Sequence, residues 1–275
     1  GVNRENTRYL NEGGWYSCDK VRFRQGTPEK IGGWQQVSNE QFLGVCRALW
    51  PWAALGGQTY IGVGTNLKYY ITLAGGGVYN DVTPIRKTVS PMAANPFAGD
   101  GTTTVTVTDI AHDCITGDFV TFSGATGTYA STFNAEFQVT VLSLDTYTIT
   151  TGSAIIAGSY GGSGVTANYQ INIGDAIQVP LTGWGAGGWG GGGWGVGTTG
   201  TALTNIRIWN HYNFGEDLIF GPKNGPMYYW DATGGLSSNP GEALTSLPGA
   251  SNVPTVQSLL IVSDASRFVL AFGCN

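Results

Sequence analysis

One glycine-rich segment of the 275-residue chain matches a motif that binds dinucleotides. Residues 183–188 read GWGAGG and fit the G-x-G-x-x-G fingerprint. That fingerprint needs a helix N-terminus to hold the pyrophosphate, whereas a further glycine run follows here. No Gly-Lys-Ser or Gly-Lys-Thr sequence completes a phosphate-binding loop. We therefore interpret the segment as structural and expect no bound nucleotide or other cofactor.

The acidic residues and histidines match no familiar catalytic set. Glu216 and Asp217 are neighbours in an expected strand, so their side chains point to opposite faces. They are therefore unsuited to flank a glycosidic bond. His112 and His211 are the two histidines of the chain, and no nucleophile-elbow motif accompanies them. We predict no catalytic residues. A wall or capsule hydrolase, the alternative in this class, would need a cleft with two carboxylates a few ångströms apart.

A metal site is not expected either. The aspartates Asp100, Asp109, Asp113 and Asp118 lack the D-x-D-x-D-G register of a calcium loop. Two histidines and four cysteines without Cys-x-x-Cys spacing do not make a zinc site.

Residues 183–197 place Trp184, Trp189 and Trp194 five residues apart in a run where ten of fifteen residues are glycine. Glycine costs about 1 kcal/mol per residue in a helix relative to alanine, so a helix is excluded. The three indoles still need an apolar surface to cover them. We therefore predict an extended arm whose tryptophans contact a neighbouring subunit.

The aromatic residues of the arm, and a second aromatic group that follows it (Trp209, Tyr228, Tyr229 and Trp230), have two interpretations. As a carbohydrate platform, these four residues together with Trp184, Trp189 and Trp194 would be exposed and roughly coplanar. As core or interface residues they would be buried, which is the commoner fate of large aromatic clusters. We favour burial and keep sugar binding as the alternative.

Composition indicates an all-β protein. The chain holds 44 glycines, 12% aromatic residues and 11% charged residues, against about 25% charged residues in average proteins. The interval between Lys87 and Arg207 contains no Lys or Arg, which disfavours tracking of a nucleic-acid backbone. No run of about 18 apolar residues occurs, so we expect no membrane span. The N-terminal part is basic, and we place Arg22 and Arg24 at a subunit or adaptor contact.

Three segments repeat one pattern of short strands and turns, at residues 47–71, 206–231 and 256–272. Asn-Gly and Thr-Asn pairs stand where hairpin turns need positive φ. Repeated units of short antiparallel strands are typical of propeller blades, so we predict a β-propeller-like scaffold.

The block between the first two repeats has a different pattern. Its runs alternate apolar and polar residues, as in TTTVTVT from residue 102 and EFQVTVL from residue 136, which indicates half-buried strands. We predict an inserted small β-barrel or sandwich over residues 88–170. It would separate residues 1–87, with the first blade-like unit, from residues 171–275, with the arm and further units. Because the last residues follow an apolar strand, we expect the chain to continue beyond residue 275.

Several long segments resemble virion proteins of tailed bacteriophages. They are EGGWYSCDKVRFRQGTPEKIGGW at residues 12–34, the Gly-Trp arm, FGEDLI at 214–219, GPMYYWD at 225–231 and FGCN at 272–275. TDIAHD at 108–113 and GDFVTFSGA at 117–125 are similar to a small β-module, akin to the FCCH domain of ubiquitin-activating enzymes, that recurs in phage tail proteins.

The resemblance implies a structural tail protein, the nozzle or hub ring of a short tail, with a β-propeller-like body. It implies a homo-oligomer, taken as a ring of six, that contacts the adaptor and fibres. DNA would pass through the ring without specific binding. The protein would be made in the bacterial cytoplasm and reside in the virion tail. A receptor- or carbohydrate-binding tail protein, of the adhesin or fibre type, is the alternative.

Overall fold

The structure is a computed structural model that describes residues 2–5, 7, 9–10, 12–33, 36–177, 206–236, 239–263 and 265–274. It divides into two compact units, Gly1–Asn39 and Glu40–Asn275. The regular secondary structure of the described residues is almost entirely β-strand, with one four-residue helix, α1 (Ala130–Phe133), and one 3-10 turn, η1 (Leu244–Ser246). The predicted all-β class is confirmed. No helix in these ranges has the length and apolarity of a membrane span.

The first unit contains one hairpin, made by β1 (Val21–Arg24) and β2 (Thr27–Lys30). Its two turn residues, Gln25 and Gly26, have φ of 49° and 82°. Two successive residues with positive φ match the right-handed twist of the paired strands, which explains the tight reversal.

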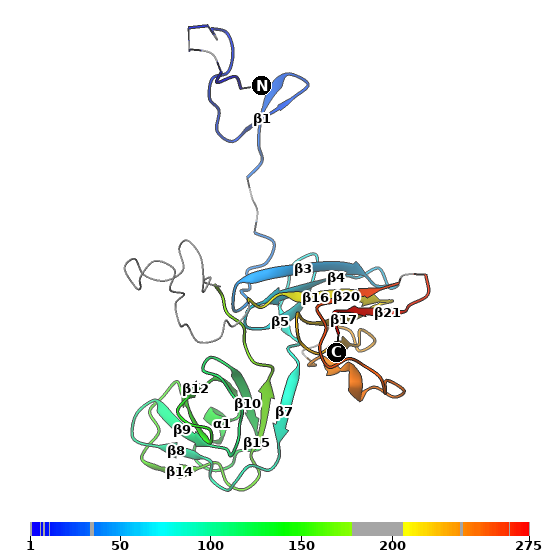
Figure 1. Cartoon of the computed structure of the whole chain (residues 1–275). Coiled ribbons are helices and arrows are strands. Elements are labelled where there is room, and N and C mark those ends of the chain that lie inside the picture. Colours follow the sequence, from blue (N-terminus) through cyan, green and yellow to red (C-terminus); the bar gives the residue numbers. More distant parts are fainter. Residues whose placement is uncertain are drawn as a thin grey trace, which may run out of the picture. The chain divides into compact units, whose positions relative to one another are not determined.

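The second unit contains two four-stranded meanders and a final hairpin, all antiparallel (Figure 1). The first sheet has β3 (Cys46–Ala53), β4 (Thr59–Thr65), β5 (Tyr69–Leu73) and β6 (Asn80–Asp81). The second sheet has β16 (Trp209–Phe214), β17 (Asp217–Pro222), β18 (Tyr228–Trp230) and β19 (Glu242–Ala243). The final hairpin has β20 (Leu259–Val262) and β21 (Val269–Phe272). Each of the two meanders has the strand order of a four-stranded propeller blade, and the final hairpin has the order of the first two strands of such a blade.

The second sheet is buried on both faces. Leu218 and Phe220 pack into a core with Tyr69 of the first sheet, whereas Ile219 packs with Leu260 of the final hairpin. Adjacent residues of a strand point to opposite faces, so one strand serves both cores. This explains why β17 reads as an uninterrupted apolar run.

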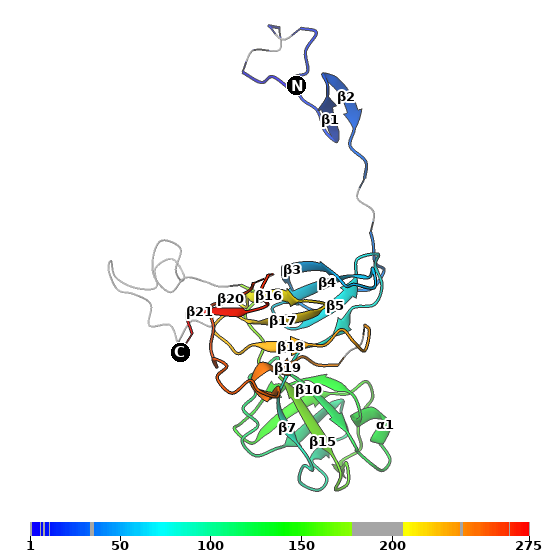
Figure 2. The ribbon, with the colours of Figure 1, turned by 90° about the vertical axis from the view of Figure 1, so that its right-hand side faces the viewer.

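The strands between Ile85 and Gln170, called the module below, form two further sheets (Figures 1 and 2). One has the order β11-β10-β15-β7 and the other β12-β13-β9-β8-β14. Their bounds are β7 (Ile85–Val89), β8 (Phe97–Gly99), β9 (Thr104–Thr108), β10 (Phe119–Ser123), β11 (Glu136–Gln138), β12 (Thr140–Val141), β13 (Thr146–Thr150), β14 (Gly158–Tyr160) and β15 (Thr166–Gln170).

The module is a sandwich, and no closed barrel forms among the described strands. Phe97 and Phe133 stack at 4.2 Å between ring centroids, and Phe97 meets the ring of Phe122 edge-on. Rings of this size between the sheets hold them at face-to-face packing distance, too far for backbone hydrogen bonds. The barrel half of the barrel-or-sandwich prediction is therefore wrong.

One predicted strand is divided. The run from Glu136 to Leu142 contributes β11 to one sheet and β12 to the other. The break falls at Val139, whose N–H donates to Asp118 O and whose carbonyl accepts from Gly117 N. Strands that change sheets form the corners of sandwiches, so this segment is a corner. The predicted domain boundaries at 87/88 and 170/171 stay predictions.

We predict that Gly64→Ala destabilises the protein. A Cβ at Gly64 would lie 2.5 Å from Cδ1 of Trp209, and that indole is fixed by its bond to Thr65 O at 2.7 Å. Overpacking of this kind costs about 1–3 kcal/mol. Gly56→Ala is the matched control, because a Cβ there meets nothing within 4 Å. Urea unfolding midpoints measure both, and equal midpoints for the two variants would contradict the predicted contact.

Candidate functional site

The predicted interface residues fall partly within the described chain. Arg22 and Arg24 lie on β1, and Arg22 Nε is 3.1 Å from Glu29 Oε2 on β2. Both side chains of this pair are exposed, at 61% and 39%, so the pair contributes at most about 1 kcal/mol. The role of the two arginines at a subunit contact stays a prediction.

Trp184, Trp189 and Trp194 lie outside the described residues, as does the glycine-rich fingerprint. Their role in subunit contacts also stays a prediction. The second aromatic group is described, and Trp209, Tyr228 and Trp230 are 4%, 4% and 2% exposed. All three belong to the core between the first and second sheets, so the exposed coplanar platform is wrong for them and burial is correct.

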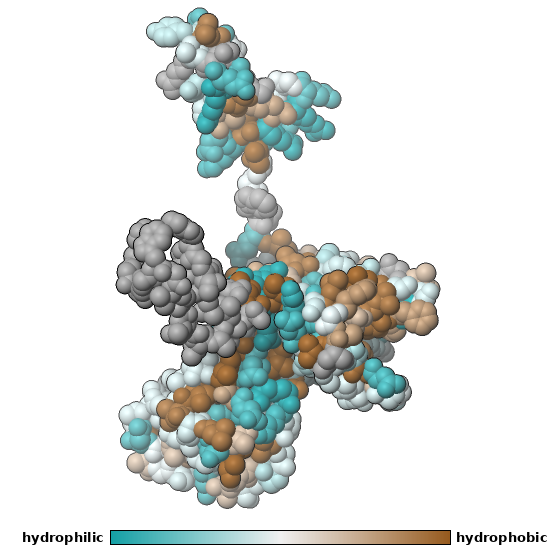
Figure 3. All heavy atoms as spheres, in the orientation of Figure 1, coloured by the Kyte–Doolittle hydropathy of each residue, from teal (hydrophilic) through white to brown (hydrophobic). Residues whose placement is uncertain are grey.

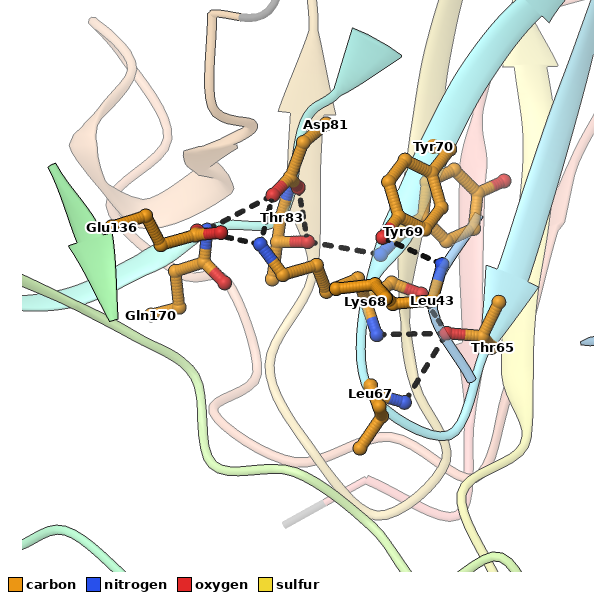
Figure 4. Close-up of polar contacts among 10 residues, drawn as sticks. All are labelled: Leu43, Thr65, Leu67, Lys68, Tyr69, Tyr70, Asp81, Thr83, Glu136 and Gln170. Carbon is orange, nitrogen blue, oxygen red and sulfur yellow. Dashed lines mark hydrogen bonds and ion pairs between the residues drawn. The ribbon is translucent and has the colours of Figure 1, made fainter. Parts of the chain in front are cut away.

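The most extensive buried polar cluster in the described chain centres on Lys68, at the turn between β4 and β5 (Figure 4). Lys68 is 2% exposed. Its ammonium lies 2.5 Å from Asp81 Oδ2 and 2.5 Å from Glu136 Oε1. We call Lys68, Asp81, Thr83, Glu136 and Gln170 the polar joint, because they connect the first sheet to β11 and β15 of the module.

Further hydrogen bonds hold both carboxylates in place. The amide of Gln170 donates to Asp81 at 3.2 Å and to Glu136 at 3.0 Å. Thr83 donates to Asp81 Oδ1 from its N–H and its hydroxyl, and its hydroxyl oxygen accepts from Tyr69 N. Charge-assisted hydrogen bonds are stronger than neutral ones, so the network fixes the geometry of the joint.

The two carboxylates of the joint both pair with Lys68. Two carboxylates converge here, as in glycosidases, where the scissile glycosidic bond lies between them. In this protein the ammonium of Lys68 occupies that space and neutralises one charge. The stem of Lys68 is covered, and Nζ lies 4.3 Å from the ring centroid of Phe119, a cation–π contact. Burial, with the charges of Asp81 and Glu136, raises the pKa of Tyr70 to about 12.

The two histidines have structural roles in separate places. His211 Nδ1 lies 3.1 Å from the hydroxyl of Tyr69, and its ring packs on Trp50. Burial lowers the pKa of His211 to about 4, so it is neutral near pH 7. His112 Nδ1 accepts from Cys114 N, and Nε2 therefore carries the proton and donates to Ser143 O.

The acidic residues considered above are likewise occupied in local structure. Glu216 accepts from Leu55 N, and Asp217 accepts from the hydroxyl of Tyr229 and from Ala232 N. Asp100 accepts from the N–H and the hydroxyl of Thr102, which lowers the pKa of Asp100. Among the described residues, no three His, Cys, Asp or Glu side chains gather as metal ligands.

Sequence reasoning missed the polar joint. A signal was present, since Lys68 stands in the apolar run Leu-Lys-Tyr-Tyr-Ile and a lysine there must find partners if the strand is buried. Its partners lie 13 and 68 residues away in the chain, and no local pattern identifies them.

Comparisons with known proteins give limited information. No family model matches the chain, and no curated protein matches it. Among solved structures, the phage phi92 endosialidase is similar at 16% sequence identity and a TM-score of 0.29, over 86% of this chain. The chain spans 35% of the length of that endosialidase. A likeness of this size carries no argument about function, and the expected lack of catalytic activity stays a prediction.

We predict that Lys68→Met destabilises the protein strongly, because it leaves two carboxylates facing each other without a cation. Removing one partner of a buried ion pair costs about 3–5 kcal/mol. The low end applies here, since Asp81 and Glu136 are 26% and 34% exposed. Arg22→Met breaks an exposed pair and is the control, with a loss below about 1 kcal/mol. Calorimetric melting of both variants tests this, and similar losses would show that the joint contributes little.

We also predict a contribution of His211 to acid sensitivity. Burial holds its folded pKa at about 4, below the ordinary histidine pKa of 6.5. Between these values the unfolded chain binds a proton that the folded chain does not, so stability falls as the pH falls through this window. We expect the pH-dependent contribution of His211 to the free energy of unfolding to be about 2 kcal/mol. This value is discounted because the ring is partly exposed.

The measurement compares urea midpoints of the wild type and His211→Gln at pH 7 and about pH 4.5. Carboxylates affect both proteins alike, so the difference isolates the histidine. Equal losses of stability in the two proteins would exclude the proposed contribution.

Proposed function

We propose that this chain is a structural subunit of a bacteriophage tail, and specifically of the nozzle or hub ring of a short tail. The segments that resemble phage virion proteins support the tail assignment. The observation that carries the ring is the apolar surface that the described residues expose at each end of the stacked sheets. A structural role fits this arrangement, because stacked sheets with open apolar ends are suited to joining copies.

The final hairpin supplies one of these surfaces. Leu260 and Val262 face the second sheet and are 3% exposed each, whereas Leu259, Ile261, Leu270 and Phe272 are 36–49% exposed. Figure 3 shows a brown area over β20 and β21. An apolar patch of this kind marks a protein contact. We call it the hairpin face.

The first sheet supplies the other surface. On β3, Ala48 and Trp50 pack toward the core, whereas Leu49 and Pro51 alternate with them and are exposed, Leu49 by 61%. The hairpin face of one copy against this β3 face of the next would repeat the sheet-on-sheet packing found inside the chain. Because the two faces differ, the contact is head-to-tail, and such contacts form a ring when the rotation between successive copies closes.

Other parts of the proposal rest on the resemblance. They are six copies per ring, contacts with the adaptor and fibres, location in the virion tail, synthesis in the host cytoplasm and passage of DNA without specific binding. The net charge of −5 fits that passage, because an acidic wall repels phosphates. Arg22, Arg24 and the tryptophan arm would add further subunit contacts.

The central prediction concerns the hairpin face. The double variant Leu259→Glu/Leu270→Glu puts charge into the proposed contact while Leu260 and Val262 stay buried. We expect the wild type to form a ring-sized oligomer and the variant to be a folded monomer. Leu55→Glu is the control, because Leu55 is 95% exposed in the β3–β4 turn.

Size-exclusion chromatography with light scattering gives the mass, and circular dichroism checks folding. A wild type that stays monomeric at every concentration would overturn the ring. In the same assay, Trp184→Ala/Trp189→Ala/Trp194→Ala is expected to weaken assembly before it unfolds the subunit. Glycan-array binding by the chain, or clearing of a wall or capsule substrate, would favour the adhesin or hydrolase alternatives.

A further inference from the structure

A cleft of about 460 Å³ opens beside the second sheet, in the size range of small-molecule sites. Its walls come from four parts of the chain: β7, the segment after β15, the residues before β16 and the β17–β18 turn. Three cations line it, Arg86, Arg207 and Lys223. No carboxylate stands among the described lining residues, although acidic residues outnumber basic ones, 18 to 13, in the whole chain.

The two arginines are held in place without being neutralised. Arg86 donates to His112 O at 2.9 Å and to Cys114 Sγ at 3.1 Å, and its guanidinium lies over the ring of Tyr169. Arg207 donates to Asn172 O and lies 5.6 Å from the ring centroid of Trp209. The ion pairs formed within the described ranges involve Arg22 and Lys68, so neither arginine of the cleft has a carboxylate partner there.

The cleft contains a hydrogen-bond donor without a partner in the described chain. Nε of Arg86 is buried and has no hydrogen-bond partner among the described residues. Tyr228 lines the cleft and is 4% exposed. An unsatisfied buried donor costs about 1–3 kcal/mol, so a ligand acceptor that reached Nε of Arg86 would recover part of this loss.

The electrostatics also favour an anion. Burial lowers the pKa of Arg207, which means that its charge is held at a cost in a partly dry site. Asp118 is one carboxylate whose charge acts on Arg207. It already accepts hydrogen bonds from Ile115 N, Asn172 Nδ2 and Ile173 N. An external anion would therefore supply the carboxylate or phosphate contact that Arg207 lacks among the described residues.

We propose that this cleft binds the oxyanion group of a small ligand that bears a carboxylate or a phosphate. Arg86, Arg207 and Lys223 supply the positive charge, and the guanidinium planes suit the geometry of both groups. The ring of Tyr228 and the prolines Pro222 and Pro226 give the apolar wall on which the rest of such a ligand lies.

The test uses the whole chain and isothermal titration calorimetry with glucuronate, glucose 6-phosphate and neutral glucose. We expect at least one acid to bind with a Kd of about 1 mM or tighter, more weakly at high salt, and glucose not to bind. Preference for glucuronate identifies the carboxylate, and preference for glucose 6-phosphate identifies the phosphate.

Lys223→Met removes one cation from an exposed turn and is expected to weaken binding about tenfold. Lys30→Met makes the same charge change on β2, outside the cleft, and is expected to leave binding unchanged. Arg86→Gln keeps a donor while removing the charge, and we expect it to weaken binding as well.

Failure of both acids to bind, or equal effects of Lys223→Met and Lys30→Met, would overturn the proposal. Binding of duplex DNA weakened by Lys223→Met, with no binding of either acid, would also overturn it in favour of a nucleic-acid contact. The cleft lies within one subunit, so binding is expected whether or not copies assemble. Light scattering on the same samples therefore separates a failed site from a failed ring.

Discussion

Apolar packing between neighbouring sheets is the interaction on which the blade-like part of this protein depends. The second sheet has Leu218 and Phe220 on one face and Ile219 on the other, all at most 2% exposed. Such a sheet is unstable alone, because either face would meet water. It needs a neighbour on each side, and the first sheet and the final hairpin supply them. The same apolar character continues at the two ends of the stack, where Leu49 of β3 and Leu259, Leu270 and Phe272 of the final hairpin are exposed.

Charged residues make up 11% of the chain, and three of the cations lie where separate parts of the chain meet. Lys68 links the first sheet to the module, and Arg86 and Arg207 lie where the segments flanking the module meet the second sheet. Each of these cations contacts an aromatic ring as well as polar partners. A buried charge that loses a partner is expensive, so these contacts favour a single arrangement of the parts. The exposed face of the final hairpin carries the apolar side chains of Leu259, Ile261, Leu270 and Phe272 instead, which suits contacts between proteins.

Local patterns were sufficient to predict most of the strands. Alternation predicted β9, β10 and β13, and the repeated turn signals predicted the meanders and the final hairpin. Burial of Trp209 and Trp230 followed from the size of their rings. The predictions that failed depend on distant residues. The corner at Val139 is set by its bonds to Gly117 and Asp118, and the barrel was excluded by core rings from several strands.

The candidate sites were harder to predict for the same reason. The polar joint combines Lys68, Asp81, Glu136 and Gln170, and the cleft combines residues from Arg86 to Tyr228. Neither set is close in sequence, and neither forms a motif. Only the type of residue gave a hint, since a lysine within an apolar strand must be compensated somewhere.

The pairing of β7 with β15 has a consequence for the history of the chain. These strands are the first and last of the module, and they lie side by side, with Val89 opposite Ala167 and Ile85 opposite Gln170. The polypeptide therefore enters and leaves the sandwich at adjacent points, an arrangement in which domain insertion is tolerated. A gene could gain, lose or exchange such a domain while the meanders on either side kept their own hydrogen bonds.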